Sequence, residues 1–228
     1  MEYERISNGF FLRRPNRFIA EVEIDGAVEI CHVRNTGRCK ELLIPGAEVF
    51  VSESLNSKRS TKYDLVSVWK GDRLINMDSQ LPNLVFNDYL KQNRFIEGIN
   101  LIKPEAKYGS SRFDFYFETA NNRAFAEVKG VTLEENNVAM FPDAPTERGV
   151  KHLKELAQCV AEGYDAYIIF IIQMLGISHF TPNNKTHPEF GAKLAEAMKA
   201  GVKAVAFDCM VTANAVTIND KIPIIMQL

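Results

Sequence analysis

The sequence of 228 residues has no apolar stretch that approaches the roughly 20 residues of a membrane-spanning helix. Its longest apolar run, "AYIIFII" at 166–172, has only the length of a strand. The first 18 residues lack the apolar core and the small-residue cleavage site of a secretory signal. The four cysteines lie far apart, which favours reduced thiols over a disulfide framework. Together these absences predict a cytoplasmic protein with no membrane partner.

An excess of positive charge is also missing, since 27 Lys and Arg stand against 29 Asp and Glu. A protein coated in positive charge is therefore excluded, and any nucleic-acid site must be a local patch. Basic residues do cluster in "FFLRRPNRF" at 10–18 and "NSKRSTK" at 56–62. Each cluster is either a solvated surface or a phosphate-binding patch.

Two common site types lack their full set of residues. Cys31, His32 and Cys39 have no second Cys/His pair that would complete a zinc site. Ser110 and Ser111 have no His/Asp arrangement at a readable spacing, so a serine hydrolase is not supported. No organic cofactor is expected.

Residues 1–80 are expected to form a first domain of short strands. Asp25–Gly26 is a hairpin turn signal, and 35–46 offers a turn followed by about one helical turn from Arg38 to Leu43. Five segments have strand character: 17–24, 27–33, 47–53, 63–70 and 72–77. Five short strands with one small helical insert predict an OB-like five-stranded β-barrel.

Residues 81–228 are expected to form a second, α/β domain. A helix at 82–93 precedes strand-like segments near 101–105, 112–118 and 123–129. Thr146 is a plausible N-cap for a helix that ends near 163. The apolar strand 166–173 completes a βαβ unit with a right-handed crossover, and a further helix (187–201) and strand (202–209) follow. The order predicts a mixed central sheet.

The stretch "RFDFYFETANNRAFAEVKG", residues 112–130, is expected to be a β-hairpin with 119–122 as its loop. In that register Glu118 faces Arg123, and Asp114 faces Glu127. The other residues follow by alternation: Arg112 opposite Lys129 beside the acids, and Phe113, Phe115, Phe117, Ala124, Ala126 and Val128 on the core face.

Two acids opposite each other destabilise a strand pair by a fraction of a kcal/mol to about 1 kcal/mol. Full exposure to water, a shared proton or a bound cation would each relieve that cost. A divalent cation fits best, because Asp114, Glu127 and the Val128 carbonyl offer the oxygen ligands that Mg²⁺ prefers. Lys129, two residues after Glu127 on the same strand face, would then reach either a metal-bound water or the scissile phosphate.

This hairpin between two helices resembles the core of the PD-(D/E)XK nuclease superfamily, with Asp114 followed by Glu127-Val128-Lys129. A closer resemblance covers nearly the whole chain. The blocks "HVRNTGRCKELL", "KYGSSRFDF" and "FPDAPTERGVKHL" resemble the sugar fermentation stimulation protein A family. The last of these blocks, residues 141–153, is long and specific.

The resemblance implies an OB-like N-terminal domain, a nuclease-like C-terminal domain, and DNA binding without marked sequence preference. It also implies a link to maltose metabolism. By motif matching, Asp114, Glu127 and Lys129 take the metal and catalytic positions, and Glu105 is a candidate further acid. His187 stands where the family usually has an aspartate, which weakens any role assigned to its loop.

The residues proposed to contact DNA lie in five regions: the two basic clusters, the loop at 35–38, the hairpin and a helix. The loop "RNTGRCK" precedes a short helix whose free N–H groups can hold a phosphate, although it is equally well a plain turn. The helix within "TERGVKHL" carries Arg148, Lys151 or His152, and Glu155 along one face, which is either solvated or turned to phosphate. The full set is Arg13, Arg14, Arg17, Asn35, Thr36, Arg38, Lys58, Arg59, Arg112, Arg148 and Lys151.

The leading hypothesis is a DNA-binding protein with a nuclease-like site that uses one or two Mg²⁺ or Mn²⁺ ions. Its DNA partner is either double- or single-stranded. The first alternative is a non-catalytic DNA-binding regulator of sugar metabolism that keeps the nuclease fold. The second is a protein-interaction module in which the acid pair is only a surface feature. The oligomeric state is left open by the sequence.

Overall fold

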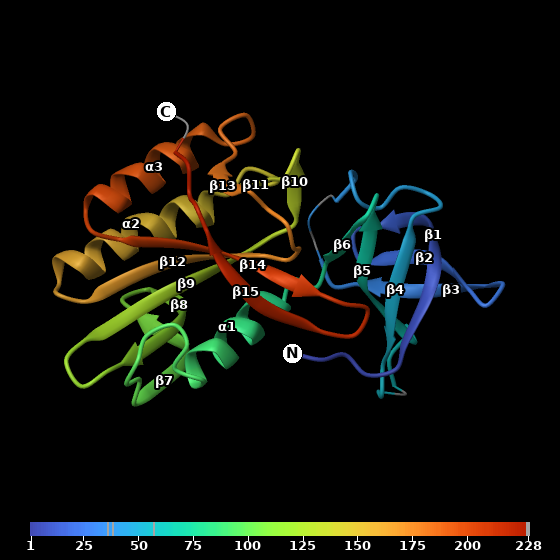
Figure 1. Cartoon of the computed structure of the whole chain (residues 1–228), viewed down its shortest axis with the longest axis horizontal. Coiled ribbons are helices and arrows are strands. Elements are labelled where there is room, and N and C mark those ends of the chain that lie inside the picture. The colour runs from blue at the N-terminus through green and yellow to red at the C-terminus, as the bar shows by residue number, and fades with distance from the viewer. Residues whose placement is uncertain (36, 38, 57, 227–228) are drawn as a thin grey trace.

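The computed structural model describes residues 1–35, 37, 39–56 and 58–226. Figure 1 shows two units side by side: a barrel formed by the N-terminal strands and a larger sheet with helices on both faces. None of the described helices combines the length and the apolar character that crossing a membrane requires.

The first unit is a five-stranded barrel, as predicted. Its sheet has the order β3-β2-β1-β4-β5-β6, and a parallel pairing of β3 with β5 closes it. The strands are β1 Ile6–Asn16, β2 Ile19–Ile24, β3 Ala27–Val33, β4 Glu48–Glu53, β5 Tyr63–Lys70 and β6 Arg73–Asn76. The closed ring consists of β1 to β5, and β6 extends the sheet from β5.

β1 was not predicted from the sequence, and β6 was taken as the fifth strand of the barrel in its place. Gly9, Pro15 and two arginines hide the alternation of β1, although Phe11 is buried in the barrel core. β2 shows the expected pattern, with Ala20 and Val22 buried. The predicted hairpin turn at Asp25–Gly26 is confirmed, because both residues have positive φ (51° and 79°) between the paired strands β2 and β3.

The second unit contains a six-stranded mixed sheet with the order β15-β14-β12-β9-β8-β7. β9, β12 and β14 are parallel, and the other pairings are antiparallel. Its elements are α1 Leu81–Lys91, β7 Leu101–Tyr108, β8 Ser111–Glu118, β9 Arg123–Val131, α2 Glu147–Ala161, β12 Asp165–Ile172, α3 Pro188–Lys199, β14 Lys203–Val211 and β15 Val216–Ile222. The helix, three strands, helix and strand expected of a nuclease-like core are present in that order. The last strand, β15, was not expected.

Two apolar clusters cover the two faces of this sheet. Phe86 and Leu90 of α1 pack with Ile169 of β12 on one face, and Leu153 of α2 packs with Phe170 of β12 on the other. The predicted N-cap of α2 is confirmed, because Thr146 Oγ1 accepts the Gly149 N–H at 3.0 Å. The start of α2 is thereby fixed at the edge of the sheet.

A small three-stranded sheet, β10-β11-β13, lies beside the larger one. Its strands are β10 Leu133–Glu135, β11 Val138–Phe141 and β13 His179–Pro182. The sequence did not predict it, because β10 and β11 are only three and four residues long, and β11 is completed by a parallel strand about forty residues later.

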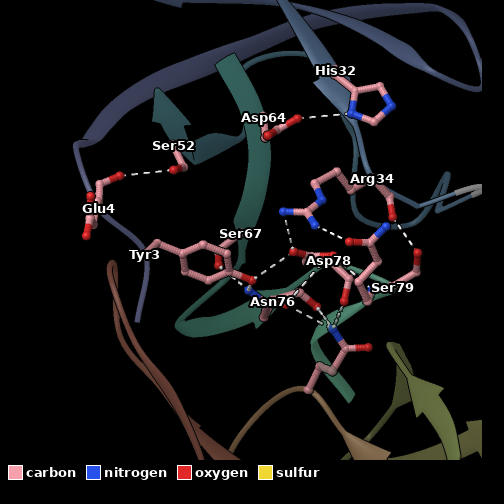
Figure 2. A network of polar contacts seen from close by, with 12 residues as sticks. Tyr3, Glu4, His32, Arg34, Ser52, Asp64, Ser67, Asn76, Asp78 and Ser79 are labelled. Carbon is pink, nitrogen blue, oxygen red and sulfur yellow. Dashed lines mark hydrogen bonds and ion pairs between the residues drawn. The ribbon is translucent and has the colours of Figure 1, made fainter. Parts of the chain in front are cut away.

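A buried polar network joins the two units (Figure 2). Asn76 donates to the hydroxyl of Tyr3 at 3.0 Å, and that hydroxyl donates to Asp78 at 3.3 Å. Gln173 Nε2, from the end of β12, donates to the Asn76 side chain at 2.9 Å and to the Asp78 carbonyl at 3.0 Å. Arg34 of the barrel lies 3.1 Å from the Asp78 carboxylate. The segment between β6 and α1 is therefore fixed from both sides.

The division at residues 80 and 81 remains a proposal. Residues 1–3 pack on the second unit: Tyr3 N–H donates to the Asn214 carbonyl at 2.7 Å, and Glu2 bridges Ala215. The first residues of the chain thus contact the end of the β14–β15 hairpin.

Candidate metal and phosphate site

The hairpin of β8 and β9 has the predicted register. Glu118 pairs with Arg123, and the described ladder continues to Phe115 opposite Ala126. The ladder ends at Phe115, next to Asp114 in the sequence. At Asp114 the side-chain carboxylate takes the place of a backbone acceptor, because Asp114 Oδ2 accepts the N–H of Val128 at 2.8 Å.

One part of the predicted hairpin is wrong. Phe113, Phe115 and Phe117 were expected on one core face. Phe115 and Phe117 share the α1 face, but Phe113 belongs to the opposite face, with its ring centroid 5.5 Å from that of Phe125. Side chains two residues apart share a face only in a regular strand. The β7–β8 ladder is interrupted here: Glu105, which lies across from Asp114 on β7, has a φ of 53°.

Glu127 is almost completely buried, at 2% exposure, and its two oxygens differ. Oε1 accepts from Lys129 Nζ at 2.5 Å and from Nδ1 of His152. Arg148 donates to Nε2 of His152 at 3.4 Å, so the ring proton lies on Nδ1, which donates to Glu127. Oε2 is buried and has no hydrogen-bond partner among the described residues.

The two acids have opposite electrostatic settings. Burial, together with the neighbouring charge of Glu127, raises the pKa of Asp114 above its usual value. Burial alone would also raise the pKa of Glu127, but the His152 hydrogen bond and the Lys129 charge outweigh it and lower that pKa. These pKa shifts favour the ionised form of Glu127 and disfavour the ionised form of Asp114.

A cavity of about 220 Å³ lies over these residues. Asp114, Glu127, Lys129 and Arg148 line it together with Asn83 of α1, which donates to Asp114 Oδ1 at 3.0 Å. Val128 and the first turn of α2 complete the wall. A buried carboxylate oxygen without a donor, next to a second carboxylate, fits an oxygen-preferring divalent cation.

Three predicted residues of this unit lie outside the cavity lining. Glu105 has a side chain 71% exposed and forms an ion pair with Arg112 at 3.3 Å. The β8–β9 ladder ends at Phe115, so Arg112 does not pair with Lys129 as predicted, and its ladder partner is Lys107 on β7. Lys151 is exposed and lies 3.6 Å from Glu155.

Several of the predicted barrel residues already have acidic or carbonyl partners. Arg13 lies 2.7 Å from Glu21, and Arg59 lies 2.6 Å from Asp64. Arg14 donates to the Asn35 carbonyl at 2.7 Å, so this guanidinium holds the loop. Arg17, whose guanidinium lies over Phe18, and Lys58 are exposed, while Thr36 and Arg38 lie outside the described residues.

A second group of possible metal ligands, Glu147, His187 and Glu189, lies at the start of α2 and α3. His187 Nδ1 accepts the Thr146 N–H at 3.3 Å, so in the neutral ring the proton is on Nε2. Both acids are exposed. We assign no metal to this group, and His187 acts here in joining the two helix starts.

Sequence reasoning missed two site residues. Asn83 lies 31 positions before Asp114, and nothing in its surroundings marks it. His152 was considered only as a member of the polar face of its helix, whereas the structure buries it against Glu127. Its spacing of four residues from Arg148 was the available signal, because that spacing brings two side chains together on a helix.

Comparisons with known proteins cover both units. Residues 12–77 match the family model described as SfsA N-terminal OB domain, and residues 80–215 match the one described as sugar fermentation stimulation protein RE domain. A sugar fermentation stimulation protein homolog of Clostridium beijerinckii is 57% identical over 226 residues, covering 99% of this chain and 100% of the relative. One from Desulfitobacterium hafniense is 60% identical over 220 residues, 96% of each chain.

One solved structure matches along its whole length. It is described as Pyrococcus furiosus SfsA in complex with Ca²⁺, and it superposes with a TM-score of 0.89 at 31% sequence identity. The match covers 98% of this chain and 97% of the other.

Proposed function

This chain belongs to the sugar fermentation stimulation protein family, and from that premise we propose that it is a metal-dependent phosphodiesterase acting on DNA. One observation carries the proposal. The buried Glu127 Oε2 has no donor among the described residues, beside Asp114 and in one cavity with Lys129 and Arg148. A site with two acids and two cations suits a cation together with a phosphate.

Asp114, Glu127 and the Val128 carbonyl would hold one or two Mg²⁺ or Mn²⁺ ions. The Ca²⁺ complex described for the Pyrococcus furiosus relative supports an oxygen-ligated divalent ion. When bound, such an ion would supply Lewis acidity toward a phosphoryl oxygen and a water of lowered pKa.

The protein's own groups have distinct tasks. Lys129 and His152 both donate to Glu127 Oε1, and this fixes the carboxylate with Oε2 left for the ion. The Lys129 ammonium also stabilises the negative charge that develops on the phosphoryl group. Arg148 holds the tautomer of His152 and lies at the cavity wall, where its guanidinium binds a phosphate oxygen.

DNA is bound through its phosphates by exposed basic side chains, including Arg17, Lys58 and Lys151. Such contacts give binding that tolerates sequence and weakens with salt. Arg13, Arg14 and Arg59 contribute less in this proposal, because acids or carbonyl groups already engage their guanidinium groups.

The test is cleavage of supercoiled plasmid and circular single-stranded DNA with Mg²⁺ or Mn²⁺. Wild-type protein is compared with Lys129→Ala and with Lys199→Ala, a matched change at the end of α3. Cleavage is expected in wild type and Lys199→Ala, with loss in Lys129→Ala and in EDTA. If the wild-type protein binds DNA but cleaves it no faster than Lys129→Ala does, the result would instead indicate a non-catalytic DNA-binding regulator of sugar metabolism. Absence of DNA binding would leave a protein-interaction module.

A further inference from the structure

A second cavity, of about 350 Å³, lies between the barrel and the sheet unit. It shares Ser79, Gly130 and Thr146 with the cavity of the acid pair, so the two cavities adjoin. A Cβ on Gly130 would come within 2.7 Å of both Gln173 Oε1 and Pro82 Cγ. The junction between the cavities therefore requires glycine. A group bound in the second cavity would be an immediate neighbour of a phosphate held in the first.

The two cavities differ in chemistry. The described lining of the second contains no lysine or arginine, and Asp143, at its exposed edge, is its one carboxylate. Amide groups of Asn35 and Gln173 and the apolar side chains of Met140 and Phe141 make up much of the wall. Such a lining does not suit a second phosphate. It suits an uncharged planar group with hydrogen-bonding edges.

The barrel wall of this cavity is held in place by hydrogen bonds. Arg14 donates to the carbonyls of Asn35 and Gly37 at 2.7 and 2.9 Å. The Gly37 N–H donates to Asn35 Oδ1 at 2.8 Å, which closes a tight turn.

The opposite wall is fixed by Asn183. Its side chain donates to the Pro142 carbonyl at 3.0 Å, and its N–H donates to the Phe141 carbonyl at 2.8 Å. The cavity is thus formed before any ligand arrives, as expected of a binding site.

We propose that this cavity binds an unpaired base of the nucleotide next to the scissile phosphate. The inference rests on the proposed function and names its substrate class: nucleic acid with a single-stranded or flipped nucleotide at the cleavage position. A base inside a duplex is stacked and paired, so it enters such a cavity only after extrusion from the helix. A single strand offers its bases directly, with Phe141 as the apolar face for stacking.

The experiment measures binding, so it does not depend on turnover. Single-stranded oligonucleotides carry one 2-aminopurine or one abasic site at successive positions, and a duplex of the same sequence serves as reference. Ca²⁺ is present, and strand integrity is checked on a gel. We expect a 2-aminopurine fluorescence change at one position, and about tenfold weaker binding when that position is abasic.

A cavity-filling variant provides the second arm. Thr132→Tyr places a ring in the cavity, and Thr217→Tyr is the matched change on the exposed side of β15. Thr132→Tyr is expected to weaken single-strand binding about tenfold and to remove the effect of the abasic site. Duplex affinity and Mn²⁺ affinity are expected to stay unchanged in both variants.

Two results separate this inference from the function on which it rests. If the abasic strand binds as well as the intact one at every position, the base site is overturned, while metal-dependent cleavage of DNA still stands. If neither nucleic acid nor Mn²⁺ binds, both are overturned. If circular dichroism shows that Thr132→Tyr is unfolded, the abasic series with wild-type protein is by itself the test of the base site.

Discussion

Replacing Glu127 by Gln changes the buried carboxylate to an uncharged amide. The negative charge that would hold a cation is thereby removed. In the wild type, Oε1 already accepts two donors, and Oε2 is buried without a partner among the described residues. A cation that binds the folded chain but not the unfolded one stabilises it by about 2.7 kcal/mol at 100 times its Kd. In a chain of this size, each kcal/mol raises Tm by about 2–4 °C. Saturating Mn²⁺ is therefore expected to raise the wild-type Tm by about 5–11 °C.

The assay is differential scanning fluorimetry over a Mn²⁺ titration, repeated with Mg²⁺ and Ca²⁺. Glu127→Gln is expected to shift by less than about 1 °C under the same conditions. Glu135→Gln, the same change at an exposed position of β10, is expected to respond like wild type. An equal rise in Glu127→Gln, or no rise in wild type at millimolar metal, would refute the assignment of Oε2 to a cation.

Three further outcomes follow from the contacts described above. His152→Gln is expected to weaken Mn²⁺ binding about 10- to 100-fold by isothermal titration calorimetry, because Glu127 loses a donor that orients it; unchanged affinity would contradict this. Gln173→Ala is expected to lower the free energy of unfolding by about 2–3 kcal/mol in urea titrations, since buried acceptors lose their donor. Burial raises the pKa of Asp64, but hydrogen bonds from Arg59 and His32 outweigh it and lower that pKa below 3.8. The stability from this group is therefore present above about pH 4 and lost as pH falls through its folded pKa. Asp64→Ala is expected to cost about 2–3 kcal/mol at pH 7 and less below pH 4, a pH dependence that exposed Asp72→Ala should not show.

Local pattern was enough to predict the hairpin that carries the acids. The turn residues 119–122 set the register, and alternation then placed Asp114 and Glu127 near each other. The interruption at Asp114 could not be predicted from the sequence, because it depends on a side-chain carboxylate that takes the place of a backbone acceptor. The change of face between Phe113 and Phe115 occurs at this same interruption.

Contacts between distant segments account for most of what the sequence did not predict. β11 forms with β13, about forty residues away, and neither strand is long enough to show a period. His152 and Asn83 join the site from two helices on opposite faces of the sheet. A residue's partner across such a distance is fixed by packing of the whole unit, which no local window contains.

The contact of residues 1–3 with the β14–β15 hairpin has a consequence for synthesis on the ribosome. Tyr3 leaves the exit tunnel well before its partner Asn214 is synthesised, since the two residues lie far apart in the sequence. The barrel can fold while the rest of the chain is still being translated, since domains generally fold in N- to C-terminal order. The polar network through Tyr3 and Gln173 closes only after Gln173 has been translated. Until then this network does not join the barrel to the acid-bearing sheet, so a product truncated before Gln173 would lack that connection.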